Sequence, residues 1–320
     1  MKYRGEGAIR IGVSSCLLGE EVRFDKGHKR SRFVADVLGD YVEFVSVCPE
    51  VEAGLGLPRP SMRLVREGEL IQVLEVQSRR DHTAALERHA KHRVAALRRM
   101  DLVGYVLKSG SPSCGMERVK IYTAKGPAKK EGRGVFAGAL QDALPLLPVE
   151  EEGRLNDDPI RENFIERVFG YRRLRDLFAG RWTPRQVVEF HTAHKLQLMA
   201  HSPQAYRELG RLVAGVKKME RSAFREAYER GFMEALAKRA TKGRNTNVLQ
   251  HMAGYLREAL SADEKVELQE TVEDYRLGLV PLIVPVTLMR HHVRRQGVAY
   301  LAGQVYLGPH PKELMLRNHV

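Results

Sequence analysis

The stretch Asp101–Gly115, DLVGYVLKSGSPSCG, predicts the fold of the first half of this 320-residue chain. Its first part, Leu102–Leu107, is an unbroken apolar run, which is typical of a strand buried on both faces of a parallel sheet. Its second part is a Ser-Gly-Ser-Pro-Ser turn, in which Gly110 and Pro112 favour an abrupt change of direction. The pattern therefore predicts a buried strand that places Cys114 just beyond its carboxyl end.

The other two cysteines occupy the same position relative to a predicted strand. Cys16 follows Ile11–Ser15, and Cys48 follows Val42–Val47. Because the carboxyl ends of strands line one edge of an open α/β sheet, we expect the three thiols to meet there. Three ligands without a fourth are typical of a metal or cluster site with one position open for chemistry. The alternative is three unrelated buried thiols, since free cysteine is often buried and none of these lies in a Cys-x-x-Cys pair.

The length and the cysteine content limit the classes of protein to consider. A chain of 320 residues is long for a single core and suggests two domains. Three cysteines are too few for a disulfide framework, which favours a reducing, cytoplasmic location. The amino-terminal MKYRGEGAIR lacks an apolar signal region, and no apolar run of about 18 residues occurs. We therefore expect neither secretion nor a membrane partner.

The chain carries a formal net charge of +13. Residues 151–320 hold 28 Lys and Arg against 21 Asp and Glu, and the preceding residues hold 25 against 19, so the excess is spread along the chain. Such a charge favours polyanionic partners, although a solvated Arg-rich surface is the alternative. Between Arg207 and Arg244 eleven basic residues stand against five acidic ones, with Tyr228 among them and Tyr206 just before them. Basic side chains beside aromatic ones suit phosphates and stacked bases.

The order of strand and helix patterns predicts two domains. Over residues 1–150 apolar runs alternate with helical patterns at the spacing of a doubly wound parallel sheet. Glu150–Pro159 is a break in composition that we take as the linker. Residues 151–320 are expected to be mostly helical. The predicted fold class is therefore α/β, with a Rossmann-like parallel sheet domain followed by a mostly α-helical, basic domain.

Several local elements can also be predicted. Met62–Val65 and Leu70–Val76 form a probable hairpin pattern, and Glu117–Lys125 predicts a short strand. Gly126–Gly134 is rich in Gly and Lys, which predicts an exposed, mobile loop. The helices expected in the second domain span Ile160–Phe169, Tyr171–Phe178, Thr183–Met199, Gln204–Leu212, Glu220–Lys238, Thr246–Leu260 and Ser261–Leu277.

Three motifs carry a resemblance to a known family. The first domain contains SSCLLG (14–19), VCPEVEAGL (47–55) and LKSGSPSCG (107–115). With these motifs it resembles the thiouracil desulfidase family known as TudS. The segments NDDPIRENFIERVF (156–169) and YLAGQVYLGPHPKELMLRNHV (300–320) resemble the helical domain that is fused to it in longer, RudS-like members.

The resemblance implies a cofactor and two catalytic residues. The family holds a 4Fe–4S cluster with three cysteines, which correspond here to Cys16, Cys48 and Cys114. It also uses a Glu in the CPE motif and a Ser in SPSCG, which correspond to Glu50 and Ser111. One departure is Phe24-Asp25-Lys26-Gly27, where relatives usually have Tyr-Asp-Gly. This difference weakens any role for the Asp but leaves the cluster ligands intact.

Each site residue has a chemical role and a simpler alternative. Glu50, two residues beyond a predicted ligand, is placed to activate water as a general base, unless it merely pairs with Arg59 or Arg63. Ser111 can donate a hydrogen bond to the substrate ring, unless it only caps its turn. Four further residues are expected to contact the substrate, and the basic ones among them suit a phosphate: Arg23, Lys29, Arg59 and Ser113.

We expect a desulfidase that converts 4-thiouridine to uridine by hydrolytic, non-redox removal of sulfur at an open iron. A second basic domain is useful for binding the phosphate backbone of tRNA, so 4-thiouridine in tRNA is the first choice of substrate. DNA is not expected as a partner. Free 4-thiouridine monophosphate or thiouracil is the alternative substrate. An RNA-binding iron–sulfur sensor without catalysis, and a zinc hydrolase that uses the same thiolates, are the alternatives of other classes.

Overall fold

The apolar run after Asp101 forms strand β5 (Gly104–Leu107), whose four residues are all buried. β5 lies between β1 (Arg10–Ser14) and β8 (Val149–Glu151) in a four-stranded parallel sheet of order β2-β1-β5-β8, completed by β2 (Glu43–Val47). This computed structural model describes residues 9–124 and 126–319, so the amino-terminal residues 1–8 and Lys125, where an expected strand ended, lie outside the described residues. The parallel sheet confirms the predicted fold of the first domain.

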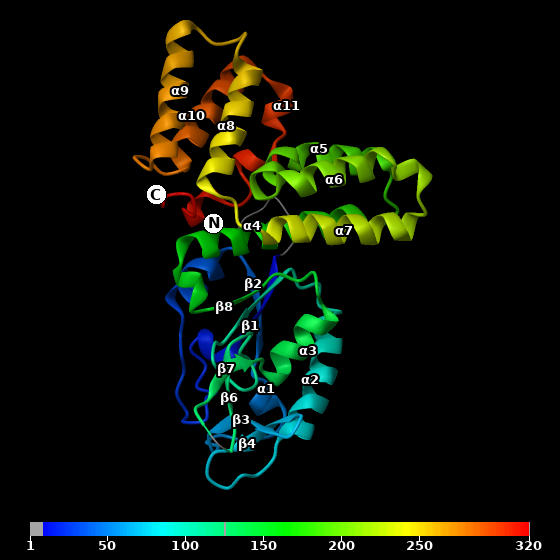
Figure 1. Ribbon diagram of the computed structural model, residues 1–320, viewed down its shortest axis with the longest axis vertical. Helices are drawn as coiled ribbons and strands as arrows, with labels where there is room; N and C mark the ends of the chain where they lie inside the picture. The colour runs from blue at the N-terminus through cyan, green and yellow to red at the C-terminus, as the bar shows by residue number, and fades with distance from the viewer. Residues whose placement is uncertain (1–8, 125, 320) are drawn as a thin grey trace. The chain divides into compact units, whose positions relative to one another are not determined.

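Two helices cover the sheet and pack against each other, α2 (Thr83–Leu97) and α3 (Val135–Ala143) (Figure 1). Tyr105 of β5 is fully buried, with its ring centroid 5.8 Å from that of Phe136 in α3. A Cβ atom at Gly12 of β1 would stand 2.2 Å from the Tyr105 ring. Only glycine therefore lets this ring lie across the neighbouring strand.

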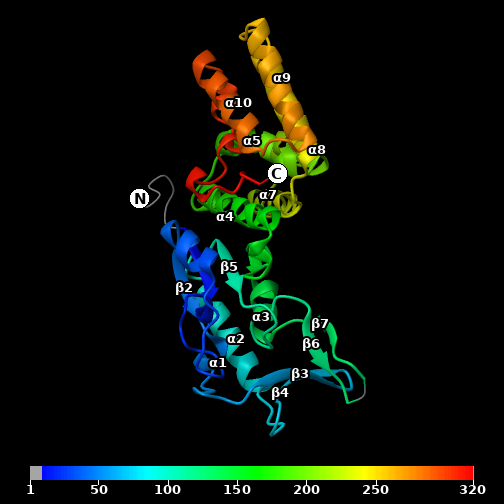
Figure 2. The same ribbon diagram turned by 90° about the vertical axis from the view of Figure 1, so that its left-hand side faces the viewer.

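A second sheet of order β4-β3-β6-β7 lies at one end of the first unit (Figure 2). Its strands β3 (Met62–Glu67) and β4 (Leu70–Glu75) form the predicted hairpin. β6 (Val119–Tyr122) pairs with β7 (Lys129–Gly132), so the mobile loop predicted over Gly126–Gly134 is wrong at these positions. The residues of β7 are exposed except Gly132, as befits a charged edge strand, and their polarity obscured the strand pattern.

The chain divides into two compact units, Met1–Asp157 and Asp158–Val320. The linker that we predicted from composition is therefore wrong in part, because its first two residues belong to β8 and are buried. The Glu151 carboxylate accepts a hydrogen bond from the backbone N–H of Met116 at 2.9 Å, and Glu150 pairs with Arg154 at 2.7 Å. Because they have these partners, the two acidic side chains can be buried in an edge strand. Their composition alone predicts an exposed linker.

The second unit is mostly helical, as predicted. Its helices are α4 (Asp158–Phe178), α5 (Pro184–His201), α6 (Pro203–Ala214), α7 (Arg221–Ala237), α8 (Lys242–Leu256), α9 (Ala262–Leu277), α10 (Ile283–Gln296) and α11 (Ala299–Ala302). α4 runs without interruption where two helices were expected, and α10 was not predicted. A proline within a sequence pattern usually argues against a helix. Pro285, however, lies in the first turn of α10, where the backbone N–H that proline lacks would have no helical partner.

Two clusters of side chains hold the second unit together. α8, α9 and α10 pack around a core that includes Leu249, Met252 and Met289. α7 contributes the aromatic column Phe224–Tyr228–Phe232, whose successive ring centroids are 5.7 and 6.1 Å apart. Over the described residues no helix is both long enough and apolar enough to cross a bilayer.

Candidate active site

The three cysteines lie around one pocket of about 400 Å³ at the carboxyl ends of the parallel strands. Cys16 follows β1 in a short 3₁₀ turn (Ser15–Leu17), and Cys48 stands between β2 and α1 (Pro49–Glu52). Cys114 lies in the turn that follows β5. The structure thus brings together the three thiols that the sequence places after three strands.

The thiols lie close enough to influence one another. Burial, with a smaller contribution from the nearby Cys48, raises the pKa of Cys16 to about 11 against the opposing effect of Lys108. Burial also raises the pKa values of Cys48 and Cys114, and the other two thiols contribute to the rise at Cys114. The three thiols, two of them buried and Cys48 half-buried, therefore share one electrostatic environment, which a bound cation or cluster would relieve by holding them as thiolates.

The spacing of the sulfur atoms bears on which metal centre they fit. Among the residues that the structure describes, these sulfur atoms do not form a group that lies within 4.8 Å of one another. A single tetrahedral zinc ion with bonds of about 2.3 Å would require separations of about 3.8 Å. An iron–sulfur cluster distributes its thiolates over several irons, and three thiols at wider spacing suit it better than a single ion.

Glu50 is held by Arg59 at the pocket wall. The Nε and Nη2 atoms of Arg59 donate to Oε2 of Glu50 at 2.8 and 2.5 Å. The same guanidinium donates to the backbone carbonyls of Val22 and Gly56, and its side chain is only 4% exposed. The pairing considered as the alternative for Glu50 is therefore present. Arg59 lines the pocket and positions Glu50, and its predicted contact with the substrate stays a prediction.

The second carboxylate oxygen of Glu50 faces two hydroxyl groups. Oε1 accepts hydrogen bonds from Ser113 Oγ at 2.9 Å and from Ser111 Oγ at 3.4 Å. Ser111 Oγ also accepts from the backbone N–H groups of Ser113 and Cys114, so it caps its turn as well as lining the pocket. Ser113 is fully buried and outside the pocket lining, and it supports Glu50 rather than a substrate.

The loop after β1 supplies the open side of the pocket. Arg23 and Lys29 line it, whereas Lys26 and His28 of the same loop do not. The contact of Arg23 and Lys29 with a substrate stays a prediction. Phe24 also lines the pocket and is 39% exposed, with the Arg23 guanidinium 5.4 Å from its ring centroid. The sequence analysis missed Phe24 as a site residue, although an aromatic side chain inside a polar loop was a usable signal.

Lys108, immediately after β5, is a second residue that the analysis missed. Its Nζ atom pairs with Glu152 Oε1 at 2.5 Å and lies on the pocket wall. It lowers the pKa of the Cys16 thiol against the effect of burial. A lysine directly beyond a buried strand was the available signal, because that position faces the same sheet edge as the cysteines.

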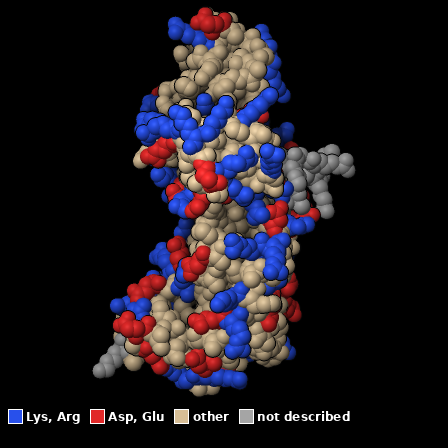
Figure 3. Space-filling model, turned by 90° about the vertical axis from the view of Figure 1, so that its right-hand side faces the viewer, with Lys and Arg blue, Asp and Glu red and all other residues tan. Residues whose placement is uncertain are grey.

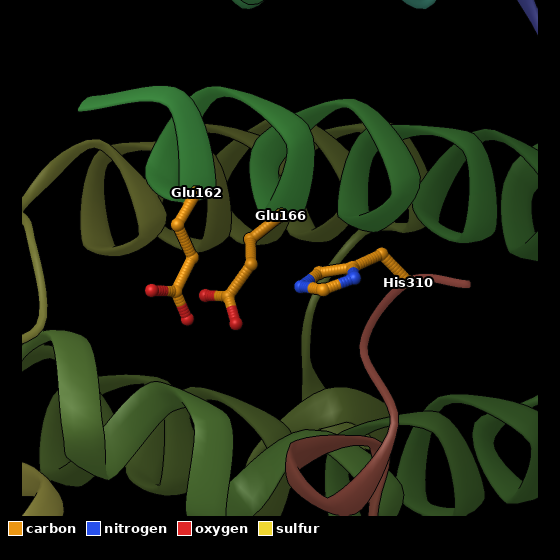
Figure 4. Close-up of side chains that lie close together, drawn as sticks. All are labelled: Glu162, Glu166 and His310. Atoms are coloured by element: carbon orange, nitrogen blue, oxygen red, sulfur yellow. The ribbon is translucent and has the colours of Figure 1, made fainter. Parts of the chain in front are cut away.

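Another group with ligand-like spacing occurs in the second unit. Glu162 and Glu166 project from one side of α4, and the His310 ring faces Glu166 (Figure 4), with the potential ligand atoms within 4.8 Å of one another. Arg317 donates to Glu166 at 2.6 Å and to Glu162 at 3.0 Å, and His201 lies 2.7 Å from Glu166. Burial raises the pKa of Glu166, but Arg317 and His201 outweigh it and hold the pKa below its usual range. Arg317 pairs with both carboxylates, so the group fastens the C-terminal segment to α4.

Comparison with known proteins identifies the class to which the first unit is related. Residues 11–152 match the sequence model of the family described as 2-thiouracil desulfurase, which supports membership of this unit in the thiouracil desulfidase family and an activity that cleaves a C–S bond. Residues 195–311 match a family described as a protein of unknown function, DUF1722.

Two individual proteins are similar to parts of the chain. A solved structure of a 4Fe–4S-dependent thiouracil desulfidase, TudS, is 33% identical with a TM-score of 0.40, and the similarity covers 47% of this chain and 94% of that one. The uncharacterized protein YbgA of Escherichia coli (strain K12) is 29% identical over 158 residues, which are 49% of this chain and 94% of YbgA.

Proposed function

We propose that this protein is a desulfidase that replaces the sulfur of a thiolated pyrimidine by oxygen. The observation that carries the proposal is the convergence of three thiols, two of them buried, and the Glu50–Ser111 pair on one pocket. This pocket lies in the unit that matches the 2-thiouracil desulfurase family.

Cys16, Cys48 and Cys114 would hold a 4Fe–4S cluster, because three converging thiols and no fourth cysteine match a cluster with one iron left open. When bound, the cluster supplies a Lewis-acidic iron with affinity for the thiocarbonyl sulfur. The pocket beside the thiols, at about 400 Å³, is within the size range of small-molecule sites.

Glu50 is the proposed general base. Glu50 lines the pocket; Arg59 fixes its Oε2, while Oε1 accepts hydrogen bonds from the hydroxyls of Ser113 and Ser111. The carboxylate takes a proton from water as the water oxygen bonds to the ring carbon. The C–S bond then breaks, and hydrosulfide leaves as the carbonyl forms. Water and the thiocarbonyl compound become hydrogen sulfide and the carbonyl compound, with no net oxidation or reduction.

The pocket mouth suits a nucleotide. Phe24 presents a half-exposed ring on which a pyrimidine can stack, and Arg23 and Lys29 provide positive charge for a phosphate beside it. Stacking is tolerant of ring substituents, so the selection of sulfur is left to the thiols and the carboxylate. These contacts are compatible both with a free nucleotide and with a nucleotide at the end of a distorted RNA segment.

We infer that 4-thiouridine in tRNA is the substrate and uridine the product. The basic second unit supports this choice, since a nucleotide substrate needs only the pocket whereas tRNA needs a surface for its backbone. Free 4-thiouridine monophosphate remains the second candidate, favoured by the fit of Arg23 and Lys29 to one phosphate at the pocket.

The decisive experiment combines cofactor and product analysis. Protein purified without oxygen is analysed for iron and sulfide, and hydrosulfide release is measured in parallel from thiolated tRNA and from 4-thiouridine monophosphate. We expect about four irons and four sulfides per chain and release from tRNA. A colourless zinc protein, or an iron protein that releases no hydrosulfide from either compound, would contradict the proposal.

Glu50→Gln separates catalysis from a sensing role. The substitution keeps the size and one hydrogen-bonding oxygen but removes the base, so we expect hydrosulfide release to fall roughly a hundred- to ten-thousand-fold with the cluster spectrum unchanged. The matched control is Glu43→Gln, an exposed carboxylate in β2 that pairs with Arg10 away from the pocket. An iron–sulfur sensor would tolerate both substitutions equally.

A further inference from the structure

A basic groove runs between α5 and α6 in the second unit, with a volume of about 690 Å³. We call it the α5–α6 groove, and its lining residues are His191, Lys195, Tyr206, Arg207, Gly210, Arg211 and Ala214. None of its lining residues is acidic. Within the described ranges, no hydrogen bond or ion pair engages Lys195, Arg207 or Arg211. Three cations are therefore available to an anion in the groove.

His191 adds a buried donor to these cations. Its side chain is 3% exposed, and its Nε2 atom has no partner among the described residues. On the other side of the ring, Nδ1 lies 3.1 Å from the hydroxyl of the fully buried Tyr228. Among the described residues this hydroxyl has no other hydrogen-bond partner, and when it donates to Nδ1 the proton of the neutral ring lies on Nε2. A buried N–H without an acceptor at a groove wall is the arrangement that a bound oxyanion completes.

Gly210 keeps this donor accessible. It lies in the interior of α6, where glycine is less favourable than alanine. A Cβ atom at this position would stand 3.9 Å from His191 Nε2, in van der Waals contact with it. The missing side chain therefore leaves room for an oxygen atom to approach the N–H from the groove.

Aromatic side chains border the groove through Tyr206. Tyr255 and Tyr300 have ring centroids 4.8 Å apart, and His251 meets the edge of Tyr255 at 5.5 Å. Tyr255 is 48% exposed. Burial raises the pKa of Tyr300 to about 12, with smaller electrostatic contributions from Tyr255 and from Tyr206, which lines the groove. We call the set of Tyr206, Tyr255, Tyr300 and His251 the tyrosine platform.

We propose that the α5–α6 groove binds backbone phosphates of an RNA strand and that the tyrosine platform stacks an unpaired base next to them. The inference rests on the proposed function, because the RNA is the thiolated tRNA that the first unit desulfurates. Cations and N–H donors bind phosphate oxygens, and exposed aromatic rings add stacking that an acidic peptide would not use. One face of the second unit carries a band of Lys and Arg side chains that would extend such contacts (Figure 3).

The test measures binding of unthiolated tRNA to the full chain, with desulfuration of 4-thiouridine monophosphate as an independent readout. We expect Arg207→Gln/Arg211→Gln to weaken tRNA binding about tenfold or more. It should also lower the slope of log affinity against log salt by roughly 1 to 2. Turnover of the monophosphate should stay unchanged. Arg294→Gln/Lys312→Gln removes the same charge from exposed positions elsewhere in this unit and should change binding by less than about threefold.

Two further variants separate the groove from net charge. Gly210→Ala favours the helix but covers His191 Nε2, so we expect weaker tRNA binding in a protein that unfolds no earlier than the parent. Tyr255→Ala should weaken binding, whereas Tyr255→Phe, which keeps the ring, should retain it.

The outcomes distinguish this inference from the proposed function. If the parent protein binds tRNA and the groove variants bind it as the control does, the groove assignment is overturned while tRNA desulfuration stands. If the parent binds no tRNA and acts only on the monophosphate, the tRNA substrate is wrong and the groove falls with it. A loss of monophosphate turnover in the groove variants would also overturn a role confined to RNA binding.

Discussion

Arg59 directs both of its bonds to Glu50 onto one oxygen atom, Oε2, and thereby leaves Oε1 to the hydroxyl groups of the turn after β5. This asymmetry matters for a general base, because one oxygen must stay available for a proton while the side chain keeps a single orientation. The pairing first considered as an alternative to catalysis is thus compatible with it. The Glu50 side chain is only 14% exposed, and Arg59 supplies the charged partner that a largely buried carboxylate needs.

We predict that Arg59→Leu destabilises the first unit by on the order of 3 kcal/mol, because it leaves a largely buried carboxylate without its partner. Glu50→Gln/Arg59→Leu should cost less than the sum of the two single substitutions, since no unpaired charge remains. Hydrogen exchange of the β5 amides in the full chain measures both effects on this unit. Strictly additive losses would show that the two side chains do not act as a pair.

At the level of single elements, α5 makes the second unit sensitive to acid. Burial lowers the pKa of His194 to about 3 and that of His191 to about 4, against an ordinary value of 6.5. The folded state therefore binds fewer protons than the unfolded state between pH 6.5 and about 4. Stability rises with pH across this window and is lost as the pH falls through it.

We predict that each histidine removes up to roughly 2 kcal/mol of stability between pH 7 and pH 5. Trp182, the only tryptophan of the chain, is buried against Phe178 and Phe224, so its fluorescence during urea unfolding reports on the second unit. His191→Gln, which stays neutral at both pH values, should reduce the difference between pH 7 and pH 5 by about half. An unchanged difference in this variant would mean that other groups dominate the acid sensitivity.

The elements also show how far the sequence could be interpreted. The three strands that precede the cysteines, β1, β2 and β5, were predictable because each is a short apolar run that ends in a turn. β7 and α10 were not predictable in this way. The lysines of β7 resemble a loop, and Pro285 of α10 resembles a helix breaker until the first turn is seen. The errors concern polar or proline-containing segments, whose structure depends on partners that are distant in the sequence.

The site was predictable to a similar degree and for a related reason. The cysteines, Glu50 and Ser111 follow strand ends, a rule of topology that sequence patterns express. The contacts of Arg59 and Ser113 with Glu50 depend on loops folding back over 9 and 63 residues, respectively, which no local pattern encodes. Sequence reasoning therefore indicated residues that line one pocket, and the structure adds that Arg59 and Ser113 hold Glu50.

For the molecule as a whole, the positive charge is divided between two units with different roles in the proposed function: residues 1–157 carry +4 and residues 158–320 carry +9. The first unit, whose pocket contains Arg23, Lys29 and Lys108, has charge where one nucleotide phosphate would sit. The second unit has charge over helices that hold no cysteine and none of the proposed catalytic residues. This division explains why one protein would need both a small pocket and a large basic surface, and it makes salt the appropriate probe.

We predict that salt separates the two candidate substrates. If six tRNA phosphates are neutralised, affinity should fall about a thousandfold between 50 and 200 mM salt, because each contact releases condensed counterions. A monophosphate has no condensed counterion layer, so kcat/KM for 4-thiouridine monophosphate should change only a few-fold over the same range. The measurement is hydrosulfide release from both substrates at four or more salt concentrations. A weak salt dependence for tRNA equal to that of the monophosphate would mean that the second unit does not contact the RNA backbone, since an uncharged contact surface responds little to counterions.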